Sequence, residues 1–265
     1  MGLGVCARYP ELELKGTVAL VTGGATGIGR AICLDLARAG VKAVVVNYSS
    51  SKQEAESTAR ELTELGAEGI PLAADVASEA QVLDLVAQTV ERQGRLDVVV
   101  NNAGTTRFIP FPDLDAVTEE VWDHILGINL KGPFYVSRAA APHLRRTKGC
   151  IVNIASIAAL RGSGSSLPYG VSKAALTQLT RALAVALAPD VRVNSVNPGL
   201  VATRWFRRGF GDEAAQAQEE KVAQSTPLQA VAAPEHVAQA VMGFIRSDMV
   251  TGQHLVVDGG KNITY

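Results

Sequence analysis

Several features that mark other classes of protein are scarce in this chain of 265 residues. It has three cysteines, Cys6, Cys33 and Cys150, an odd number without C-x-x-C spacing. This argues against a disulfide framework and suits buried thiols in a reducing compartment, so we expect a cytoplasmic protein. The four histidines lie far apart in the sequence, and without clustered ligand spacing we expect no metal site.

An excess of charge of one sign is also missing. The 25 Lys and Arg residues nearly balance the 26 Asp and Glu residues, which leaves a formal net charge of -1. We therefore expect neither a nucleic acid nor a membrane as partner. The first 30 residues show no basic stretch followed by an apolar run, and the longest strongly apolar segment, 149–160, is shorter than the roughly 20 residues of a spanning helix. We expect no secretion signal and no membrane span.

What the chain does have is a regular alternation of two patterns. Short β-branched runs predict strands at 18–22, 43–48, 69–74, 96–101, 150–155, 192–196 and 254–257. Segments rich in Ala and Leu with helical periodicity lie between them, at 28–39, 52–65, 78–93, 119–144, 169–188 and 234–247. Continuous Val runs such as 44–46 and 98–100 are typical of parallel strands covered on both faces.

This alternation predicts an α/β protein with a Rossmann-type, doubly wound, seven-stranded parallel sheet and helices on both faces. No linker or repeat divides the chain, so we expect a single dinucleotide-binding domain over 1–265. One segment, at about 200–226, departs from the alternation and is interpreted as a substrate lid. It carries aromatic and basic residues: Trp205, Phe206, Phe210, Arg204, Arg207 and Arg208. These arginines suit an anionic substrate group or, equally, a solvated surface.

A glycine-rich turn follows the first predicted strand. It runs from Thr22 to Gly29 with glycines at 23, 24, 27 and 29, and a helix is predicted directly after it. Glycines let the backbone approach a pyrophosphate, whose charge then lies at the positive end of the helix. The turn therefore predicts a dinucleotide site, although a glycine-rich loop alone is weak evidence.

At this point the chain resembles the short-chain dehydrogenase/reductase family, of the shorter, single-domain kind. The family's T-G-x-x-x-G-x-G segment is matched by 22–29, its N-N-A-G by 101–104 and its P-G segment by Pro198 and Gly199. Asp75 and Val76 resemble the pair that the family places against adenine, and the less favoured alternative is that Asp75 caps the helix that begins near Ser78. The match covers roughly residues 15 to 260.

The residues that suggest chemistry are a tyrosine, a lysine and a serine. Tyr169 and Lys173 are four apart in a predicted helix and so project from one face, while Ser156 ends the fifth predicted strand. A nearby cation favours phenolate, so we expect Lys173 to lower the pKa of Tyr169 toward the working pH. The resemblance implies four catalytic residues: Asn129, Ser156, Tyr169 and Lys173. It implies that Tyr169 exchanges a proton with the substrate oxygen while Ser156 binds that oxygen. It also implies that Lys173 binds the nicotinamide ribose and that Asn129 holds a water that relays protons to Lys173.

The cofactor-binding set combines the resemblance with the motifs above: Gly23, Thr26, Gly27, Ile28, Gly29, Asn47, Tyr48, Ser49, Ser50, Asp75, Val76, Asn102, Ala103, Gly104, Tyr169, Lys173, Pro198, Gly199, Val201 and Thr203. A carboxylate after the second strand would select NAD. None is present at 46–52, where Asn47, serine hydroxyls and Lys52 offer donors to a phosphate. We therefore expect NADP(H) to be preferred and NAD(H) to be possible, although Thr26 stands where NADP-dependent relatives often carry a basic residue.

The resemblance implies an NAD(P)-dependent oxidoreductase that interconverts a carbonyl and a secondary alcohol. The family's substrates include acyl-carrier-linked 3-ketones, sugars, polyols and steroids, and the sequence does not choose among them. Homotetramers, or homodimers, built through helices near 119–144 and 169–188 are also implied. The main alternative is a non-catalytic NADP(H)-binding sensor. Enoyl reductases of similar fold space the Tyr and Lys more widely, which disfavours C=C reduction.

Overall fold

The computed structural model describes residues 12–203, 205 and 211–264. Its centre is a sheet of seven parallel strands in the order β3-β2-β1-β4-β5-β6-β7. The strands are β1 (Val18–Val21), β2 (Ala43–Tyr48), β3 (Glu68–Ala73), β4 (Val98–Asn101), β5 (Cys150–Ile154), β6 (Arg192–Pro198) and β7 (His254–Val257). The order reverses between β1 and β4, so the predicted doubly wound fold is confirmed, and ligands of such sheets bind at this switch point.

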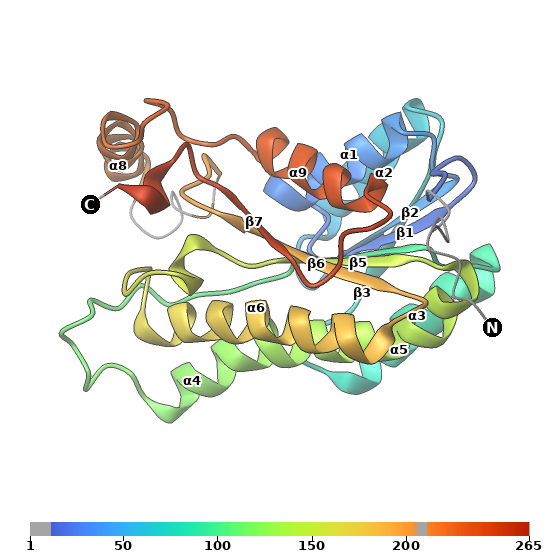
Figure 1. Ribbon diagram of the computed structural model, residues 1–265, viewed down its shortest axis with the longest axis horizontal. Helices are drawn as coiled ribbons and strands as arrows, with labels where there is room; N and C mark the ends of the chain where they lie inside the picture. Colours follow the sequence, from blue (N-terminus) through green and yellow to red (C-terminus); the bar gives the residue numbers. More distant parts are fainter. Residues whose placement is uncertain (1–11, 204, 206–210, 265) are drawn as a thin grey trace, which may run out of the picture.

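Helices cover both faces of the sheet (Figure 1). One layer holds α1 (Gly27–Arg38), α2 (Lys52–Glu64) and α9 (Pro234–Arg246). The other holds α3 (Glu79–Gln93), α5 (Gly132–Thr147) and α6 (Leu167–Leu187), with α4 (Glu119–Leu126) packed against α6. Alternate residues of β2 explain the two-sided burial, because Val44 and Val46 join the core under α1 while Val45 joins the core under α3.

The helix predicted over 119–144 is divided in the structure. After α4 the chain makes a short π-helical turn, Gly127–Lys131, before α5 begins at Gly132. Pro133 lies in the first turn of α5, and because proline has no N–H it cannot continue the hydrogen-bond ladder of α4. Such π-turns are frequent at functional sites, and this one carries Asn129.

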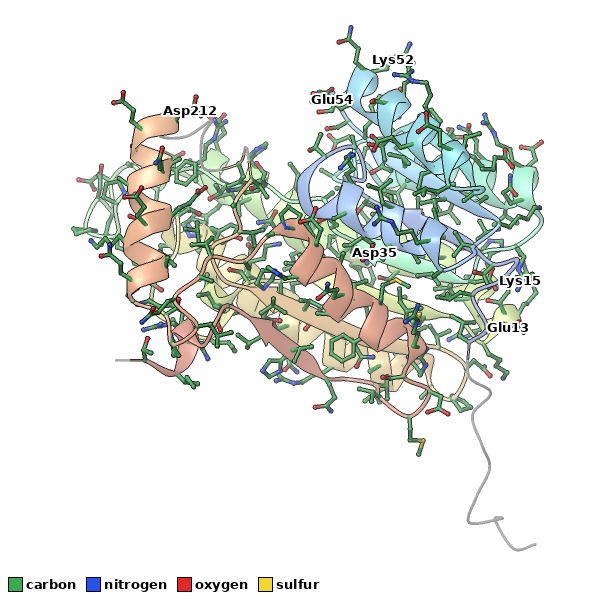
Figure 2. The ribbon with its side chains drawn as sticks, turned by 90° about the horizontal axis from the view of Figure 1, so that it is seen from above. Glu13, Lys15, Asp35, Lys52, Glu54 and Asp212 are labelled. Atoms are coloured by element: carbon green, nitrogen blue, oxygen red, sulfur yellow. The ribbon has the colours of Figure 1, made fainter. Side chains whose placement is uncertain are left out.

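A second difference concerns the segment interpreted as a lid, where the structure has a helix, α8 (Asp212–Gln224). In Figures 1 and 2 it stands apart from the sheet, close to the C-terminal end of the chain. Ala215 is its one buried residue, so the helix has little apolar periodicity to reveal it in the sequence. The predicted lid residues Arg204, Phe206, Arg207, Arg208 and Phe210, like Cys6, lie outside the described residues.

Candidate active site

The glycine-rich turn forms a cradle at the start of α1. Gly23 and Gly27 have φ values of 60° and 54°, a region that favours glycine. A Cβ at Gly29 would lie 2.2 Å from the carbonyl oxygen of Gly23, so no side chain fits there. Thr26, the N-cap of α1, makes no side-chain capping bond to the helix. The first N–H groups of α1 therefore remain for a ligand, and the cradle suits a pyrophosphate.

Asn102 and Ala103 join this cradle to the end of β4. The side-chain amide of Asn102 donates to the carbonyl oxygens of Thr22 and Gly23, both at 3.0 Å. The backbone N–H groups of Asn102 and Ala103 donate to the Thr22 hydroxyl, also at 3.0 Å. The segment after β6 reaches the same place, since a Cβ at Gly27 would lie 3.5 Å from the Thr203 methyl group. Three predicted cofactor-binding segments thus meet at one edge of the sheet.

The polar residues at the end of β2 and just after it divide into buried and exposed groups. Asn47 is buried, and its amide nitrogen donates to the carbonyl oxygens of Leu72 and Ala74 at 3.3 and 3.1 Å. Our expectation that Asn47 offers a donor to a phosphate is therefore wrong, because that nitrogen holds β2 to the end of β3. Its Oδ1 instead accepts from the N–H of Gly23 at 3.4 Å, which ties β2 to the cradle.

Donors that remain available beside β2 lie further along the chain. Tyr48 is half-buried, whereas Ser49 and Ser50 are exposed. Lys52 starts α2 and points outward beside Glu54 (Figure 2). Its ammonium lies 3.8 Å from the Glu56 carboxylate. The local field is therefore less positive than Lys52 alone suggests.

Asp75 and Val76 follow β3 at the same edge of the sheet. Ser78, not Asp75, caps α3, since the Ser78 hydroxyl accepts from the N–H of Gln81 at 3.5 Å. The exposed Asp75 carboxylate accepts from the N–H of Ala77 at 2.9 Å. Val76 is buried against Gly132, where an added Cβ would lie 2.9 Å from a Val76 methyl group. The two residues therefore form a fixed turn beyond β3.

Tyr169, Ser156 and Lys173 converge as the sequence predicted. Ser156 lies just beyond β5, and its side chain is near enough to the Tyr169 phenol, in the first turn of α6, to lower the pKa of that phenol through hydrogen bonding. The Lys173 ammonium lies one turn further along α6, 5.8 Å from the centre of the Tyr169 ring. It is 4% exposed and donates to the carbonyl oxygen of Ile154 at 2.9 Å. A phenol, a hydroxyl and a buried cation thus share one site.

The electrostatics of this group differ from our expectation. Burial raises the pKa of Tyr169 above its ordinary value, and this outweighs the lowering by the hydrogen bond with Ser156. Burial also lowers the pKa of Lys173 from 10.5 to about 8. The prediction that Lys173 lowers the pKa of Tyr169 is therefore wrong for this arrangement. Desolvation of the phenol dominates, and the ammonium is directed at the Ile154 carbonyl.

Asn129 lies in the π-helical turn and is fully buried. Its Oδ1 accepts from the backbone N–H of Thr105 at 2.8 Å, and its amide nitrogen donates to the Thr105 carbonyl and the Ser172 hydroxyl at 3.0 Å each. A Cβ at Gly104 would lie 3.5 Å from both Asn129 Oδ1 and Lys173 Nζ. Asn129 thus holds the segment after β4 beside Lys173.

Three segments follow β4, β5 and β6 at this edge of the sheet, and they start at Thr105, Ile157 and Gly199. The Thr106 hydroxyl bonds to the Ser165 hydroxyl at 2.6 Å, and the N–H of Ile109 donates to the Ser165 carbonyl at 2.9 Å. These bonds join the loop after β4 to the loop before α6. Pro198 ends β6, and Val201 pairs with Ala232 further on.

Sequence reasoning missed two residues that support this site. Ser172 receives the Asn129 amide and donates to the Tyr169 carbonyl at 2.7 Å. Asn197 is buried, and its amide donates to the Ser156 carbonyl at 3.1 Å. Asn197 stands next to the quoted Pro198 at a strand end, which could have revealed it; Ser172 gave no comparable signal.

Comparison with known proteins agrees with this geometry. Residues 23–262 match a family model described as Enoyl-(Acyl carrier protein) reductase. The chain is 47% identical over 249 residues to the protein named ketoacyl reductase 2 of the granaticin polyketide synthase of Streptomyces violaceoruber, covering 93% of this chain and 96% of that protein. The chain belongs to the short-chain dehydrogenase/reductase family. It is therefore an oxidoreductase of a family that depends on NAD(P).

Further members of the family show the same relation. A 3-oxoacyl-(acyl-carrier-protein) reductase of Thermotoga maritima is 35% identical over 254 residues, which cover 94% of this chain and 99% of that protein. The L-rhamnose 1-dehydrogenase (NAD(P)(+)) of a Sphingomonas species is 38% identical over 256 residues, covering 94% and 98%. A crystal structure described as a short-chain alcohol dehydrogenase from Sinorhizobium meliloti 1021 superposes with a TM-score of 0.86 at 32% identity, covering 97% of this chain and all of that one.

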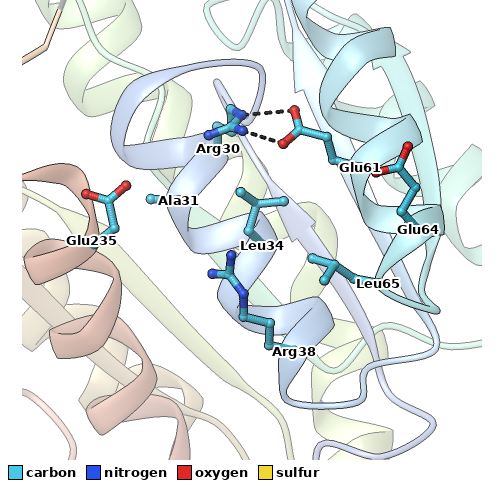
Figure 3. A pocket seen from close by; sticks show the side chains of 8 residues that line it. All are labelled: Arg30, Ala31, Leu34, Arg38, Glu61, Glu64, Leu65 and Glu235. Atoms are coloured by element: carbon cyan, nitrogen blue, oxygen red, sulfur yellow. Dashed lines mark hydrogen bonds and ion pairs between the residues drawn. The ribbon is translucent and has the colours of Figure 1, made fainter.

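A surface pocket of about 290 Å³ lies elsewhere on this short-chain dehydrogenase/reductase, among α1, α2 and α9 (Figure 3). Arg30 and Glu61 form an ion pair across its upper end. Arg38, Glu64 and Glu235 also line it, so carboxylates outnumber guanidinium groups and an anion is poorly accommodated. None of the predicted catalytic residues contributes to it.

Proposed function

We propose that this protein interconverts a ketone and a secondary alcohol with a bound nicotinamide dinucleotide, and that it works chiefly as a reductase. The observation that carries the proposal is the convergence of the Ser156 and Tyr169 side chains beside the buried Lys173 ammonium. A hydroxyl pair at this place can bind one carbonyl oxygen, and the phenol can transfer a proton to it. The nicotinamide, when bound, supplies or accepts the hydride.

The protonation state of the phenol suits it for the step of ketone reduction in which a proton is donated. Because burial raises the pKa of Tyr169, the phenol keeps its proton at neutral pH and is ready to donate it to a carbonyl oxygen. Alcohol oxidation needs the phenolate, so its rate should rise with pH through the alkaline range. Lys173, with a pKa of about 8, is still charged at pH 7 and lies beside the Tyr169 ring.

Asn129 is proposed to act on Lys173 through the loop after β4. Its side chain holds both backbone groups of Thr105, and this fixes Gly104 against the ammonium. Proton relay by a water at Asn129 remains part of the proposal. Its Oδ1 lies next to the Gly104 position that Lys173 also faces.

NADP(H) is proposed as the preferred cofactor, with NAD(H) as a possible substitute. Support comes from the absence of a carboxylate at 46–52 and from the exposed Ser49, Ser50 and Lys52. Replacing Lys52 by Ala should lower kcat/KM for NADPH about fivefold or more and leave that for NADH nearly unchanged. Lys42→Ala, at the opposite end of β2 and also exposed, is the matched control. A wild-type preference for NADH would contradict the cofactor proposal.

The substrate is proposed to be the ketone of a 3-oxoacyl chain, which residues 200–226 would help to cover. Two of the relatives above are named as ketoacyl or 3-oxoacyl reductases. Because another relative is named as a rhamnose dehydrogenase, sugars are the second candidate class of substrate. A panel of 3-oxoacyl thioesters, sugars and enoyl thioesters, read by nicotinamide absorbance with NADPH and NADH, tests this directly. Faster turnover of an enoyl thioester would contradict carbonyl reduction. Tight cofactor binding without any turnover would favour a sensor.

Self-association, as a homotetramer or homodimer, is also proposed. Apolar side chains are exposed on helices of one layer, with Phe134 on α5 and Val171 and Val185 on α6. Leu255 is exposed on the edge strand β7. Light scattering of the purified protein tests the assembly.

A cytoplasmic location is proposed from the buried thiols of Cys33 and Cys150. No described helix has the length and apolarity to span a membrane.

A further inference from the structure

A tightly bonded turn directly follows β7. The Asp258 carboxylate accepts from the backbone N–H groups of Gly260 and Asn262, at 2.8 and 2.5 Å. Gly259 and Gly260 have φ values of 63° and 89°, which other residues rarely adopt. A short helical turn, Lys261–Ile263, completes this C-terminal turn, which we define as residues 258–264. Its shape is therefore fixed by its own backbone.

The C-terminal turn contacts the segment that follows β6. A Cβ at Gly199 would lie 2.7 Å from Asp258 Cβ and 3.7 Å from the Ile157 side chain. Gly199 thus lies between the C-terminal turn and the residue that directly follows Ser156. Any shift of Asp258 would therefore be transmitted, through direct packing, to the edge of the sheet where Ser156 lies.

The same turn also holds the far end of α8. The Lys261 ammonium donates to the Ser225 hydroxyl at 3.0 Å, just beyond the last residue of α8. The N–H of Leu228 donates to the Gly259 carbonyl at 3.0 Å. A Cβ at Gly260 would lie 2.7 Å from the Pro227 ring. Figure 1 shows α8 beside the C-terminal end of the chain and away from the sheet, and these contacts hold the residues that directly follow its last turn.

Arg161 connects this assembly to the loop that carries Ser156. Its guanidinium donates to the carbonyl oxygens of Lys261 and Thr264, at 2.7 and 3.3 Å. Among the described residues it forms no ion pair with a carboxylate. The planar guanidinium group has several N–H donors in fixed directions, so it can bind two carbonyl oxygens of the same turn at once. Arg161 therefore fastens the C-terminal turn from the side of Ser156, while Lys261 fastens it from the side of α8.

We propose that Arg161 is a positioning residue that sets the size of the substrate site. It acts through the C-terminal turn, which holds the Ser156 loop and the end of α8 at a fixed separation. The inference rests on the proposed carbonyl reduction at Tyr169. In this proposal a large ketone extends between these two segments, whereas a small one needs only the Ser156 and Tyr169 hydroxyls. Loosening the turn should therefore change discrimination between large and small ketones and leave cofactor binding intact.

The test compares Arg161→Gln with wild type on one long and one short 3-oxoacyl thioester. We expect the ratio of the two kcat/KM values to change at least fivefold, mainly through KM, while the Kd for NADPH stays within twofold. Arg161→Lys, which can reach one carbonyl, should restore part of the ratio. Arg181→Gln is the matched control, since Arg181 is an exposed arginine of α6 that bonds Gln178 and His254. An unchanged ratio, or an equal loss for both ketones, would overturn the inference.

A second measurement does not depend on turnover. Hydrogen exchange of the α8 amides should be at least fivefold faster in Arg161→Gln than in wild type, and unchanged in Arg181→Gln. A chain ending at Gly260 loses the contacts of Arg161 and also the Lys261 bond to Ser225, so its α8 amides should exchange at least as fast as in Arg161→Gln. Adding Arg161→Gln to this shortened chain should change little, because the partners of Arg161 are already gone. Unaltered exchange in α8 would refute the mechanical link. Failure of wild type to reduce any ketone would instead refute the proposed function.

Discussion

Replacing Lys173 by Met should make the protein more stable near neutral pH while it removes activity. The Lys173 ammonium is 4% exposed, and burial lowers its pKa from 10.5 to about 8. At about 1.4 kcal/mol per pKa unit, this difference means that the charged form costs the folded state about 3 kcal/mol. Losing the hydrogen bond to the Ile154 carbonyl costs about 1 kcal/mol. The net gain in the free energy of unfolding is therefore about 2 kcal/mol at pH 7.

The pH dependence of this gain identifies its cause. Below pH 8 the lysine is charged in both the folded and the unfolded state, so the full cost is present. Between pH 8 and 10.5 the unfolded chain binds the proton and the folded chain does not, so wild-type stability rises with pH relative to the variant. The advantage of Met should thus disappear by about pH 10.5.

Urea unfolding of both proteins at pH 7, 9 and 10.5 measures this difference directly. Lys42→Met, which replaces an exposed lysine, is the control and should show no such trend. If Lys173→Met were less stable than wild type at pH 7, or if the difference did not shrink with rising pH, the assignment of a strained, buried ammonium would be refuted.

Two further predictions concern the cradle and the core. Gly29→Ala places a Cβ 2.2 Å from the Gly23 carbonyl oxygen and should raise the Kd for NADPH at least tenfold. Gly243→Ala, which adds a Cβ in open space on α9, is the control and should leave this Kd unchanged. Equal affinities of Gly29→Ala and wild type in a fluorescence titration would contradict the assignment of the cradle. Asp97→Ala removes a fully buried carboxylate that accepts from the N–H of Val18 at 2.9 Å and pairs with Arg95. It should lower the free energy of unfolding by about 2 to 4 kcal/mol, and a loss below 1 kcal/mol in urea unfolding would count against this pairing.

The sheet and the convergence of Ser156 with Tyr169 could be predicted because they follow from rules of parallel sheets. The Val runs of β2 and β4 have one stable environment, between two helical layers. Residues at the carboxyl ends of such strands must meet at one edge. Tyr169 and Lys173 then need only helical spacing to join Ser156.

The parts that could not be predicted depend on burial and on local backbone exceptions. The pKa of Tyr169 depends on how much water the site excludes, and residue spacing does not reveal that. Asn47 looked like a surface donor, but its position in β2 turns its amide into the sheet edge. The π-turn at Asn129 interrupts an otherwise continuous helical pattern. The helix α8 has too few buried residues to produce a periodic signal.

The most direct test of the account is Tyr169→Phe, which removes the phenol hydroxyl and keeps the ring. We expect kcat for ketone reduction with NADPH to fall by about a hundredfold or more, while the Kd for NADPH stays within twofold. Tyr135→Phe, on α5, is the matched control and should retain wild-type turnover. Turnover near that of wild type in Tyr169→Phe would show that the proton comes from elsewhere and would contradict the proposed site.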